Sequence, residues 1–309
     1  LFGMEPARVE ACRVLEVGCA SGGNLLPMAA SLPDSQFVRL DFSPVQIDRG
    51  AADVKALGLK NVELLPMDIM DLTDAHGEFD YIIAHGVYSW VPNAVQERLL
   101  EICARQLKPA GIAYVSYNTL PGWHMRGMIR DMMVHHSAGF AGATAKVGQA
   151  RGLLDFLPRS APEDTPYGMM LRQESEAIRK EPDAYLFHEH LEENNQAFYF
   201  HEFADLAARH GLVYLGEADL NDMLVSSFPP EVAQTLQRVA TDIIRMEQYM
   251  DFVRNRVFRQ TLLVHQDARI QRNIDGRVLQ GLQVSSAVQP ESARPVLTHG
   301  ASETFKTPA

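Results

Sequence analysis

Short apolar runs alternate with stretches of helical periodicity along the first 120 residues of the chain. The apolar runs that predict buried strands cover residues 13–19, 36–41, 61–65, 80–84 and 112–117. Between them, apolar side chains recur at helical spacing in residues 24–30, 43–57 and 93–107. Strands that alternate with helices in this way predict an α/β fold with a doubly wound, Rossmann-like parallel sheet. In such a sheet a ligand binds outside the carboxyl ends of the strands.

The second half of the chain predicts helical insertions and two more strands. A helix is expected over 201–210, and strands are expected over 212–216 and 261–265. The resulting division is a core (1–120), a helical insertion forming a lid or acceptor region (121–200), a segment completing the sheet (201–268) with its own helical insertion (221–257), and a linker or start of a further module (269–309). An independent C-terminal α/β module is the alternative to a single sheet.

A loop of small residues follows the first predicted strand. It reads Glu16, Val17, Gly18, Cys19, Ala20, Ser21, Gly22, Gly23 and Asn24. Small residues let the backbone approach a ligand closely, but the loop lacks both the Lys-Ser/Thr pair of a Walker motif and the full GxGxxG spacing. The carboxylate of Glu16 would repel a phosphate and attract the ammonium of a methionine group. S-adenosylmethionine is therefore favoured over NAD, with a glycine turn used only for packing as the alternative.

Acidic residues also end the second and third predicted strands. Asp41, followed by Phe42 and Ser43, is placed to accept hydrogen bonds from ribose hydroxyls, with capping of the next helix as the alternative. Asp68 is placed to accept from an adenine amino group, with capping of a turn as its alternative. Met67 and Ile69 would then lie on the two sides of the adenine ring.

Candidates for the reacting end of the site follow the fourth and fifth predicted strands. They are His85, Gly86, Tyr88, Trp90, Asn118 and Trp123. His85 and Gly86 are expected beside the methionine arm of the cofactor, and His85 is a candidate base. Tyr88 and Trp90, with Trp123 as a further substrate-binding candidate, could surround a methylated ammonium by cation–π contact, although packing is an equal alternative. Asn118 could orient the acceptor or bind the carboxylate, and Tyr88 is a second candidate base.

Composition narrows the choice of partners and of compartment. The net charge is −11, which disfavours nucleic acid as a partner. No apolar run approaches the roughly 20 residues that span a bilayer, so no membrane segment is expected. The three cysteines form no CxxC pair and are consistent with a cytoplasmic protein. His188, His190 and His201 do not have HExxH spacing, and no metal site is predicted.

Taken together, the glycine loop (14–23), Asp41 with Ser43-Pro44, and Met67-Asp68 resemble class I methyltransferases over roughly residues 12–120. The resemblance implies S-adenosylmethionine as cofactor and S-adenosylhomocysteine as product. It also implies that the sheet ends with a helix, a strand and an antiparallel last strand.

Further stretches resemble bacterial methyltransferases that carry a methyltransferase regulatory domain, which would correspond to about 188–267 here. These stretches are 80–92, 116–123, 188–195 and 258–263. The best-understood members methylate lysines of outer-membrane proteins and carry further C-terminal modules, so the chain is expected to be truncated at both ends. The resemblance implies a protein lysine acceptor. A small-molecule methyltransferase and a cofactor-binding regulatory or scaffold protein with little turnover stay open, and so does the oligomeric state.

Overall fold

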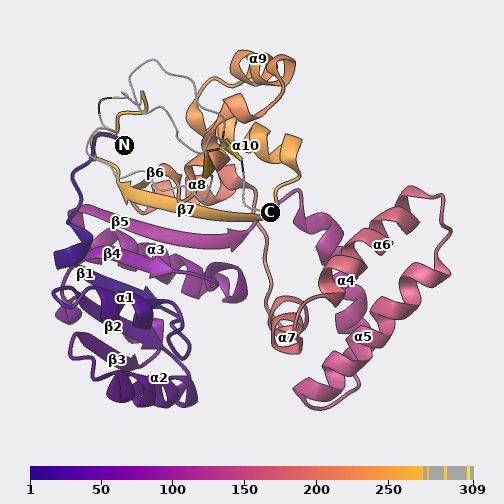
Figure 1. Cartoon of the computed structure of the whole chain (residues 1–309), viewed down its shortest axis with the longest axis horizontal. Coiled ribbons are helices and arrows are strands. Elements are labelled where there is room, and N and C mark those ends of the chain that lie inside the picture. The colour runs from indigo at the N-terminus through magenta and orange to yellow at the C-terminus, as the bar shows by residue number, and fades with distance from the viewer. Residues whose placement is uncertain (274–276, 278–288, 291–304, 307–309) are drawn as a thin grey trace. The chain divides into compact units, whose positions relative to one another are not determined.

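The computed structural model describes residues 1–273, 277, 289–290 and 305–306 (Figure 1). Residues 5–268 form one compact unit, and residues 1–4 with 269–309 form a second unit. In the second unit, β8 (Gln289–Pro290) pairs antiparallel with β9 (Phe305–Lys306). The rest of the predicted linker or module beyond residue 273 lies outside the described residues, apart from residue 277.

A seven-stranded sheet organises the larger unit (Figure 1). Its strands are β1 (Arg13–Val17), β2 (Gln36–Asp41), β3 (Val62–Pro66), β4 (Phe79–Ala84), β5 (Leu107–Asn118), β6 (Leu212–Glu217) and β7 (Phe258–His265). Their order is β3-β2-β1-β4-β5-β7-β6. The strands from β3 to β5 pair in parallel, and β7 is antiparallel to both of its neighbours. The predicted Rossmann-like fold is confirmed, and β6 and β7 belong to the same sheet as the first five strands.

Strand β5 begins earlier than the sequence predicts. The helical pattern is predicted to end at residue 107 and the strand to begin at residue 112, which leaves 108–111 as a turn between them, but the structure starts β5 at Leu107. Phe79 pairs with Leu107 and Tyr81 pairs with Ile112, so the register shifts between these pairs. A bulge of this kind absorbs residues that cannot join a regular ladder, such as a proline without an N–H group.

Helices cover both faces of the sheet. The α-helices outside the insertions are α1 (Leu25–Ser31), α2 (Pro44–Leu57), α3 (Asn93–Gln106) and α8 (Phe200–Arg209). Val14 and Phe37 pack with α1, whereas Leu15 and Val38, which point to the other face, share a core with residues of α3 and α8. Parallel strands buried on both faces explain the continuous apolar runs in the sequence. Short 3₁₀ helices complete the unit: η1 (Val9–Ala11), η2 (Ile69–Asp71), η3 (Asp74–His76), η4 (Tyr88–Trp90), η5 (Leu220–Met223) and η6 (Val225–Ser227).

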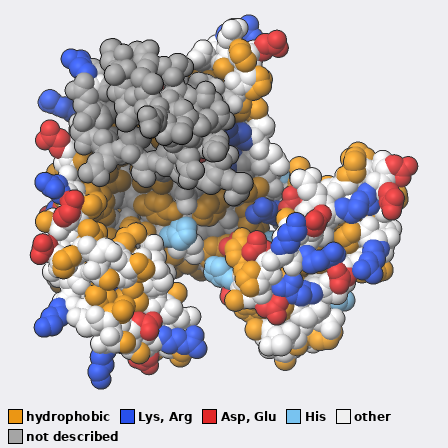
Figure 2. Space-filling model, viewed as in Figure 1, with side chains coloured by type: hydrophobic (Ala, Val, Ile, Leu, Met, Phe, Trp, Pro, Cys, Tyr) orange, Lys and Arg blue, Asp and Glu red, His pale blue; other side chains and the backbone are white. Residues whose placement is uncertain are grey.

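The stretch between β5 and α8 has a hydrophobic core of its own. Its helices are α4 (Trp123–Ser137), α5 (Ala143–Ser160), α6 (Pro166–Arg179) and α7 (Asp183–Leu191). Ile129, Leu154, Leu171 and Leu186 contribute one buried side chain from each helix. The outer surfaces of these helices carry intermixed acidic and basic side chains (Figure 2). In the described part of the chain, no helix combines the length and apolar character that crossing a membrane requires.

A second helical insertion, α9 (Pro230–Val239) and α10 (Ile243–Arg254), joins β6 to β7. A buried ionic cluster fastens α10 to these strands. Arg259 of β7 donates to Glu217 of β6 (Nη1–Oε1, 2.6 Å), to Glu247 (Nη2–Oε2, 3.0 Å) and to Asp251 (Nε–Oδ2, 2.9 Å) of α10. Each of these side chains is at least 97% buried. Arg256 adds a second contact to Asp251 at 2.9 Å. Three buried carboxylates face two guanidinium groups, and Arg256 also contacts the half-exposed carboxylate of Asp222 at 3.4 Å, so negative groups outnumber positive ones in the cluster.

That imbalance acts on Glu247. The pKa of Glu247 is raised to about 7, mainly by burial and also by the neighbouring Glu217, while Arg259 opposes the rise. Removing a charged group from water without full compensation costs several kcal/mol, so the protonated form is favoured. The folded protein therefore binds a proton at Glu247 over a pH range in which the unfolded chain has released it.

We expect Glu247→Gln to change the pH dependence of stability. Because the folded pKa of about 7 lies above the ordinary value of 4.5, the contribution of Glu247 is fully present below pH 4.5 and is lost as the pH rises to about 7. The wild-type free energy of unfolding, relative to that of the variant, should fall by up to about 1.4 kcal/mol per pH unit in that interval. Urea unfolding of both proteins from pH 4 to 8 measures this difference in the free energy of unfolding. Glu176→Gln, which removes an exposed carboxyl group of α6, is the control. A difference between wild type and Glu247→Gln that does not vary with pH would contradict the prediction.

Candidate active site

The loop between β1 and α1 requires glycine at two positions. Gly18 has a φ of +67° and Gly22 a φ of +103°, which side chains of L residues rarely tolerate. A Cβ on Gly18 would lie 2.4 Å from Cγ2 of Val87, and a Cβ on Gly22 would lie 2.1 Å from Nη1 of Arg39. These two glycines therefore let the loop backbone lie directly on side chains of β2 and of the loop that follows β4.

Asp41 connects this loop to the end of β2. Its Oδ2 accepts a hydrogen bond from the backbone N–H of Ala20 (2.7 Å), and its Oδ1 accepts one from the backbone N–H of Ser43 (2.8 Å). Ser43 occupies the N-cap position of α2, but its own side chain forms no capping bond. Phe42, between these residues, is 75% exposed. The carboxylate of Asp41 thus shapes the loop and the helix start, and both of its oxygens face backbone groups of the candidate site.

Glu16 forms a buried ion pair that the sequence analysis missed. Its Oε2 lies 3.3 Å from Nε of Arg39 in β2, and its Oε1 accepts from Nδ2 of Asn24 at 2.8 Å. Arg39 is completely buried and also donates to the carbonyl of Cys19 at 3.2 Å. Burial raises the pKa of Glu16, although Asn24 and Arg39 oppose the effect.

The sequence predicts that the charge of Glu16 favours an ammonium over a phosphate ligand, and the structure adds that Arg39 shares this charge. A guanidinium at 3.3 Å offsets most of that charge. The sequence does contain a sign of this ion pair. Arg39 is a charged residue inside an apolar strand run, between Val38 and Leu40, and such a residue needs a buried partner.

The remaining predicted cofactor residues divide between exposed and buried positions. Cys19 is buried, which raises the pKa of its thiol to about 11, and Ser21 is half-buried. At the end of β3, Asp68 accepts through Oδ1 from the backbone N–H of Met70 (2.9 Å), as a capping residue does. Met67 is half-buried against the main core, and Ile69, 7% exposed, is part of it.

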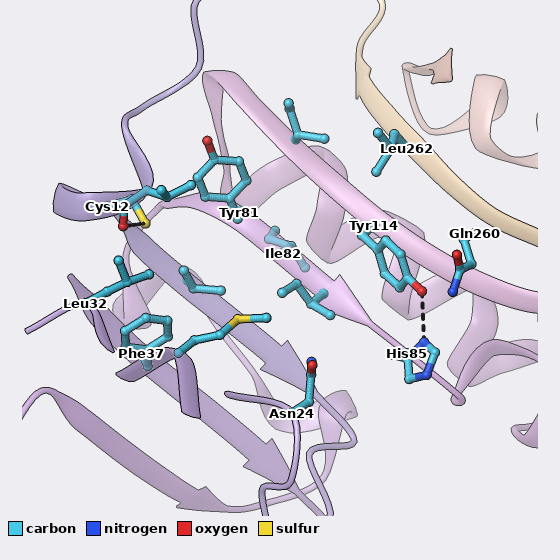
Figure 3. Close-up of a pocket in the computed structure, with 15 residues that line it drawn as sticks. Cys12, Asn24, Leu32, Phe37, Tyr81, Ile82, His85, Tyr114, Gln260 and Leu262 are labelled. Atoms are coloured by element: carbon cyan, nitrogen blue, oxygen red, sulfur yellow. Dashed lines mark hydrogen bonds between the residues drawn. The ribbon is translucent and has the colours of Figure 1, made fainter. Parts of the chain in front are cut away.

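His85 directly follows β4 and lies beside two hydroxyl groups of β5. Its Nδ1 lies 2.9 Å from the hydroxyl of Tyr114 and 3.2 Å from Oγ of Ser116 (Figure 3). The next residue, Gly86, has a φ of +68° and donates its backbone N–H to the same Oγ at 2.9 Å. No atom lies within 4 Å of the Cβ position of Gly86, so the space beside this backbone is open. The ring of Phe258 meets His85 edge-on, with centroids 6.3 Å apart.

An apolar pocket of about 560 Å³ extends from His85 along one face of β1, β4, β5 and β7 (Figure 3). Asn24, His85, Tyr114 and Gln260 provide the polar side chains at one end of it (Figure 3). Tyr114, Gln260 and Phe258 were not predicted as site residues. Phe258 and Gln260 lie in the stretch 258–263 that resembles the family, which was the available signal, whereas Tyr114 looks like an ordinary strand residue in the sequence.

Tyr88 is a correction to the predicted site. Its ring is 0% exposed and packs against Phe198 and Phe203, at centroid distances of 5.2 Å, and against Tyr117. Burial raises the pKa of the Tyr88 hydroxyl well above its ordinary value. A side chain enclosed in this way can contact neither a substrate nor bulk solvent, so Tyr88 is a packing residue in this structure.

Trp90 and Trp123 meet where the sheet joins the helical insertion. Their ring centroids are 6.4 Å apart, and the ring of His188 lies 4.7 Å from that of Trp90. Asn118, at the end of β5, is 3% exposed, and its Nδ2 donates to Oδ1 of Asn195 at 3.4 Å. The predicted substrate residues other than Tyr88 thus lie at the junction between the core and α4 and α7.

The histidines of the second half are dispersed. His190 is buried with its ring stacked near Trp123, whereas His201 bonds to Gln248 of α10 (Nδ1–Oε1, 2.9 Å). Among the described residues, no group of three or more His, Cys, Asp or Glu side chains could hold a metal ion.

Two family descriptions match this chain. Residues 14–111 match a "Methyltransferase domain", and residues 182–265 match a "Predicted methyltransferase regulatory domain". With the fold described above, the chain belongs to the class I S-adenosylmethionine-dependent methyltransferases that carry this regulatory domain.

Particular members of the family resemble it closely. Uncharacterized protein RP789 of Rickettsia prowazekii is 47% identical over 292 residues, covering 94% of this chain and 53% of that protein. Uncharacterized protein RP028 of the same organism is 43% identical over 210 residues, covering 68% of this chain and 84% of that protein. The structure of PKMT2 from Rickettsia typhi in complex with AdoHcy matches with a TM-score of 0.89 and 41% identity, covering 100% of this chain and 60% of that one. The chain thus spans about half the length of RP789.

We expect Gly22→Ala to disrupt the loop and Gly23→Ala to be tolerated. The new Cβ at position 22 would collide with the guanidinium of Arg39 at a positive φ, whereas a Cβ at position 23 meets no atom within 4 Å. Displacing one member of a buried ion pair costs about 3–5 kcal/mol. Thermal or urea unfolding of both variants measures the difference. Equal stability of the two variants would contradict the role given to Gly22.

Proposed function

We propose that the protein is an S-adenosylmethionine-dependent methyltransferase that modifies lysine side chains of proteins. The observation that carries the proposal is the convergence of the Gly18–Gly22 loop, Asp41, Asp68 and His85 at the carboxyl ends of β1 to β4. A solved relative with 41% identity, PKMT2 from Rickettsia typhi, is described in complex with AdoHcy. AdoHcy is what S-adenosylmethionine becomes after it gives up its methyl group.

The residues at this edge fit the parts of the cofactor. The open space beside Gly86 and the positive-φ loop provide room next to backbone N–H groups. Asp41 already accepts two backbone hydrogen bonds, but each carboxylate oxygen has a second lone pair that can accept from a ribose hydroxyl. The carboxylate of Asp68 likewise has lone pairs left to accept a hydrogen bond from an adenine amino group. The exposed ring of Phe42 offers a face for contact with the adenine ring. Asn24 and Glu16 are the polar groups for the amino-acid end.

The bound cofactor supplies an activated methyl group, so the protein contributes mainly by orienting the acceptor. A lysine amine has an ordinary pKa of about 10.4 and must be neutral to attack. Trp90 is half-buried at the junction with the insertion, where its ring can contact an ammonium or its methylated product. The acidic residues Glu192 and Glu193, which directly follow α7, would attract a lysine-rich segment.

A small-molecule acceptor is the second candidate, and one observation favours it. The pocket of about 560 Å³ beside His85 has mainly apolar walls and the size of a small-ligand site. A lysine side chain needs no such cavity, because only its narrow methylene stem has to enter the active site.

Methyl-labelled S-adenosylmethionine distinguishes the candidates. The protein is incubated with labelled cofactor and a bacterial extract separated into membrane-protein, soluble-protein and small-molecule fractions. Label in a protein that mass spectrometry maps to methylated lysine supports the proposal. Label only in the small-molecule fraction supports the second candidate, and cofactor binding without any transfer supports a regulatory or scaffold protein.

We expect Asp41→Ala to weaken the binding of S-adenosylhomocysteine by about 10- to 100-fold, which corresponds to one or two hydrogen bonds to a charged group. Isothermal titration calorimetry measures the dissociation constant. Asp48→Ala, which removes an exposed carboxylate of α2, is the control. Because Asp41 also holds the loop, circular dichroism must confirm that both variants are folded. Unchanged affinity in folded Asp41→Ala would exclude the ribose assignment.

A further inference from the structure

We propose that Tyr114 and Ser116 hold His85 in the tautomer that carries its proton on Nε2, so that His85 acts as a hydrogen-bond donor in the site and not as a base. Its role toward the ligand rests on the proposed function, whereas the tautomer itself does not. Tyr114 and Ser116 are positioning residues, because they act through the imidazole ring.

The geometry limits what Nδ1 can do. Two hydroxyl oxygens lie within hydrogen-bond distance of this one nitrogen, at 2.9 Å for Tyr114 and 3.2 Å for Ser116. The β5 strand brings both hydroxyls to the ring, because residues two positions apart point to the same face. Nε2 has no hydrogen-bond partner among the described residues, and the His85 side chain is accessible. A ligand would therefore meet Nε2.

The number of hydroxyl protons determines which group donates in the hydrogen bonds among Ser116, Tyr114 and Nδ1 of His85. The backbone N–H of Gly86 donates to Oγ of Ser116, so that oxygen already serves as an acceptor. Gln260 and Ser116 also form hydrogen bonds with the oxygen of Tyr114 that favour its ionised form, as donors to that oxygen do. Ser116 has a single hydroxyl proton and gives it to Tyr114, so the hydroxyl proton that Nδ1 accepts is that of Tyr114, at 2.9 Å. If Nδ1 carried the proton, it would be a third donor to a Tyr114 oxygen that has two lone pairs, and the proton of Tyr114 itself would lack an acceptor among these groups.

The charge of the ring agrees with this arrangement. Burial lowers the pKa of His85, which favours the neutral ring at neutral pH. A neutral N–H donor does not repel a sulfonium cation, as an imidazolium would. The ligand group that suits it is a carboxylate oxygen. Asn24 lies across the pocket from His85 and bonds to Glu16, so the two sides of the site suit the carboxylate and the ammonium of one amino-acid group (Figure 3).

The tautomer can be read directly from protein labelled with ¹⁵N-histidine. In long-range ¹H–¹⁵N correlation spectra, a protonated ring nitrogen and an unprotonated one have widely separated shifts. His85→Gln assigns the signals by their disappearance. We expect wild-type His85 to be protonated on Nε2 at neutral pH, and the double variant Tyr114→Phe/Ser116→Ala to show a mixture of tautomers. A proton on Nδ1 in the wild type, or an unchanged spectrum in the double variant, would overturn the inference.

Amide substitutions test the donor role with the same protein. The amide nitrogen of glutamine can replace Nε2, whereas that of asparagine replaces Nδ1. His85→Gln should bind S-adenosylhomocysteine within about 3-fold of wild type, and His85→Asn should lose about 5- to 10-fold, the value of one hydrogen bond. The donor role would be refuted if His85→Asn bound S-adenosylhomocysteine as tightly as His85→Gln, or more tightly. If the wild type does not bind S-adenosylhomocysteine at all, the proposed function fails and the donor role fails with it, while the ¹⁵N spectra still decide the tautomer.

Discussion

The candidate site rests on the buried contact between Glu16 and Arg39. Parallel pairing of β1 with β2 sets these two residues opposite each other, and their side chains form an ion pair at 3.3 Å. The guanidinium lies directly against Gly22 and donates to the carbonyl of Cys19. A charge buried in this position is stable only with its partner, so the register of the sheet, the glycine loop and the orientation of Glu16 depend on one another.

Buried ion pairs also hold α10 against strands β6 and β7 of the sheet. Arg259 gathers carboxylates from β6 and α10, and the antiparallel β7 that carries it pairs with β5. Phe258, one residue earlier, thereby reaches the ring of His85. Segments more than 170 residues apart in the sequence thus meet at one edge of the sheet. A regulatory domain built in this way has direct contact with His85, the residue that we propose donates to the amino-acid end of the cofactor.

Two features of this edge point to different acceptors. The cluster of Trp90, Trp123 and His188 lies on the side of the helical insertion, where a polypeptide could approach. The apolar pocket begins at His85 and extends along the face of the sheet. The role of His85 as donor or base affects both alternatives. If it is a donor, deprotonation of a lysine falls to water or to another group, because the methyl group is already activated and the demand on a base is modest.

The sequence by itself determined the sheet, because apolar runs and helical periodicity are local and repeat every few residues. It predicted β2 at its observed bounds and placed Glu16, Asp41 and Asp68 at or near the ends of successive strands. It failed at β5, where a bulge replaces the expected turn, and at Tyr88, whose burial depends on Phe198 and Phe203 far along the chain. Only the tertiary structure decided that Arg39 pairs with Glu16 and that Tyr114 contacts His85. Such contacts depend on which strands become neighbours and in which register, and no local pattern of residues records that choice.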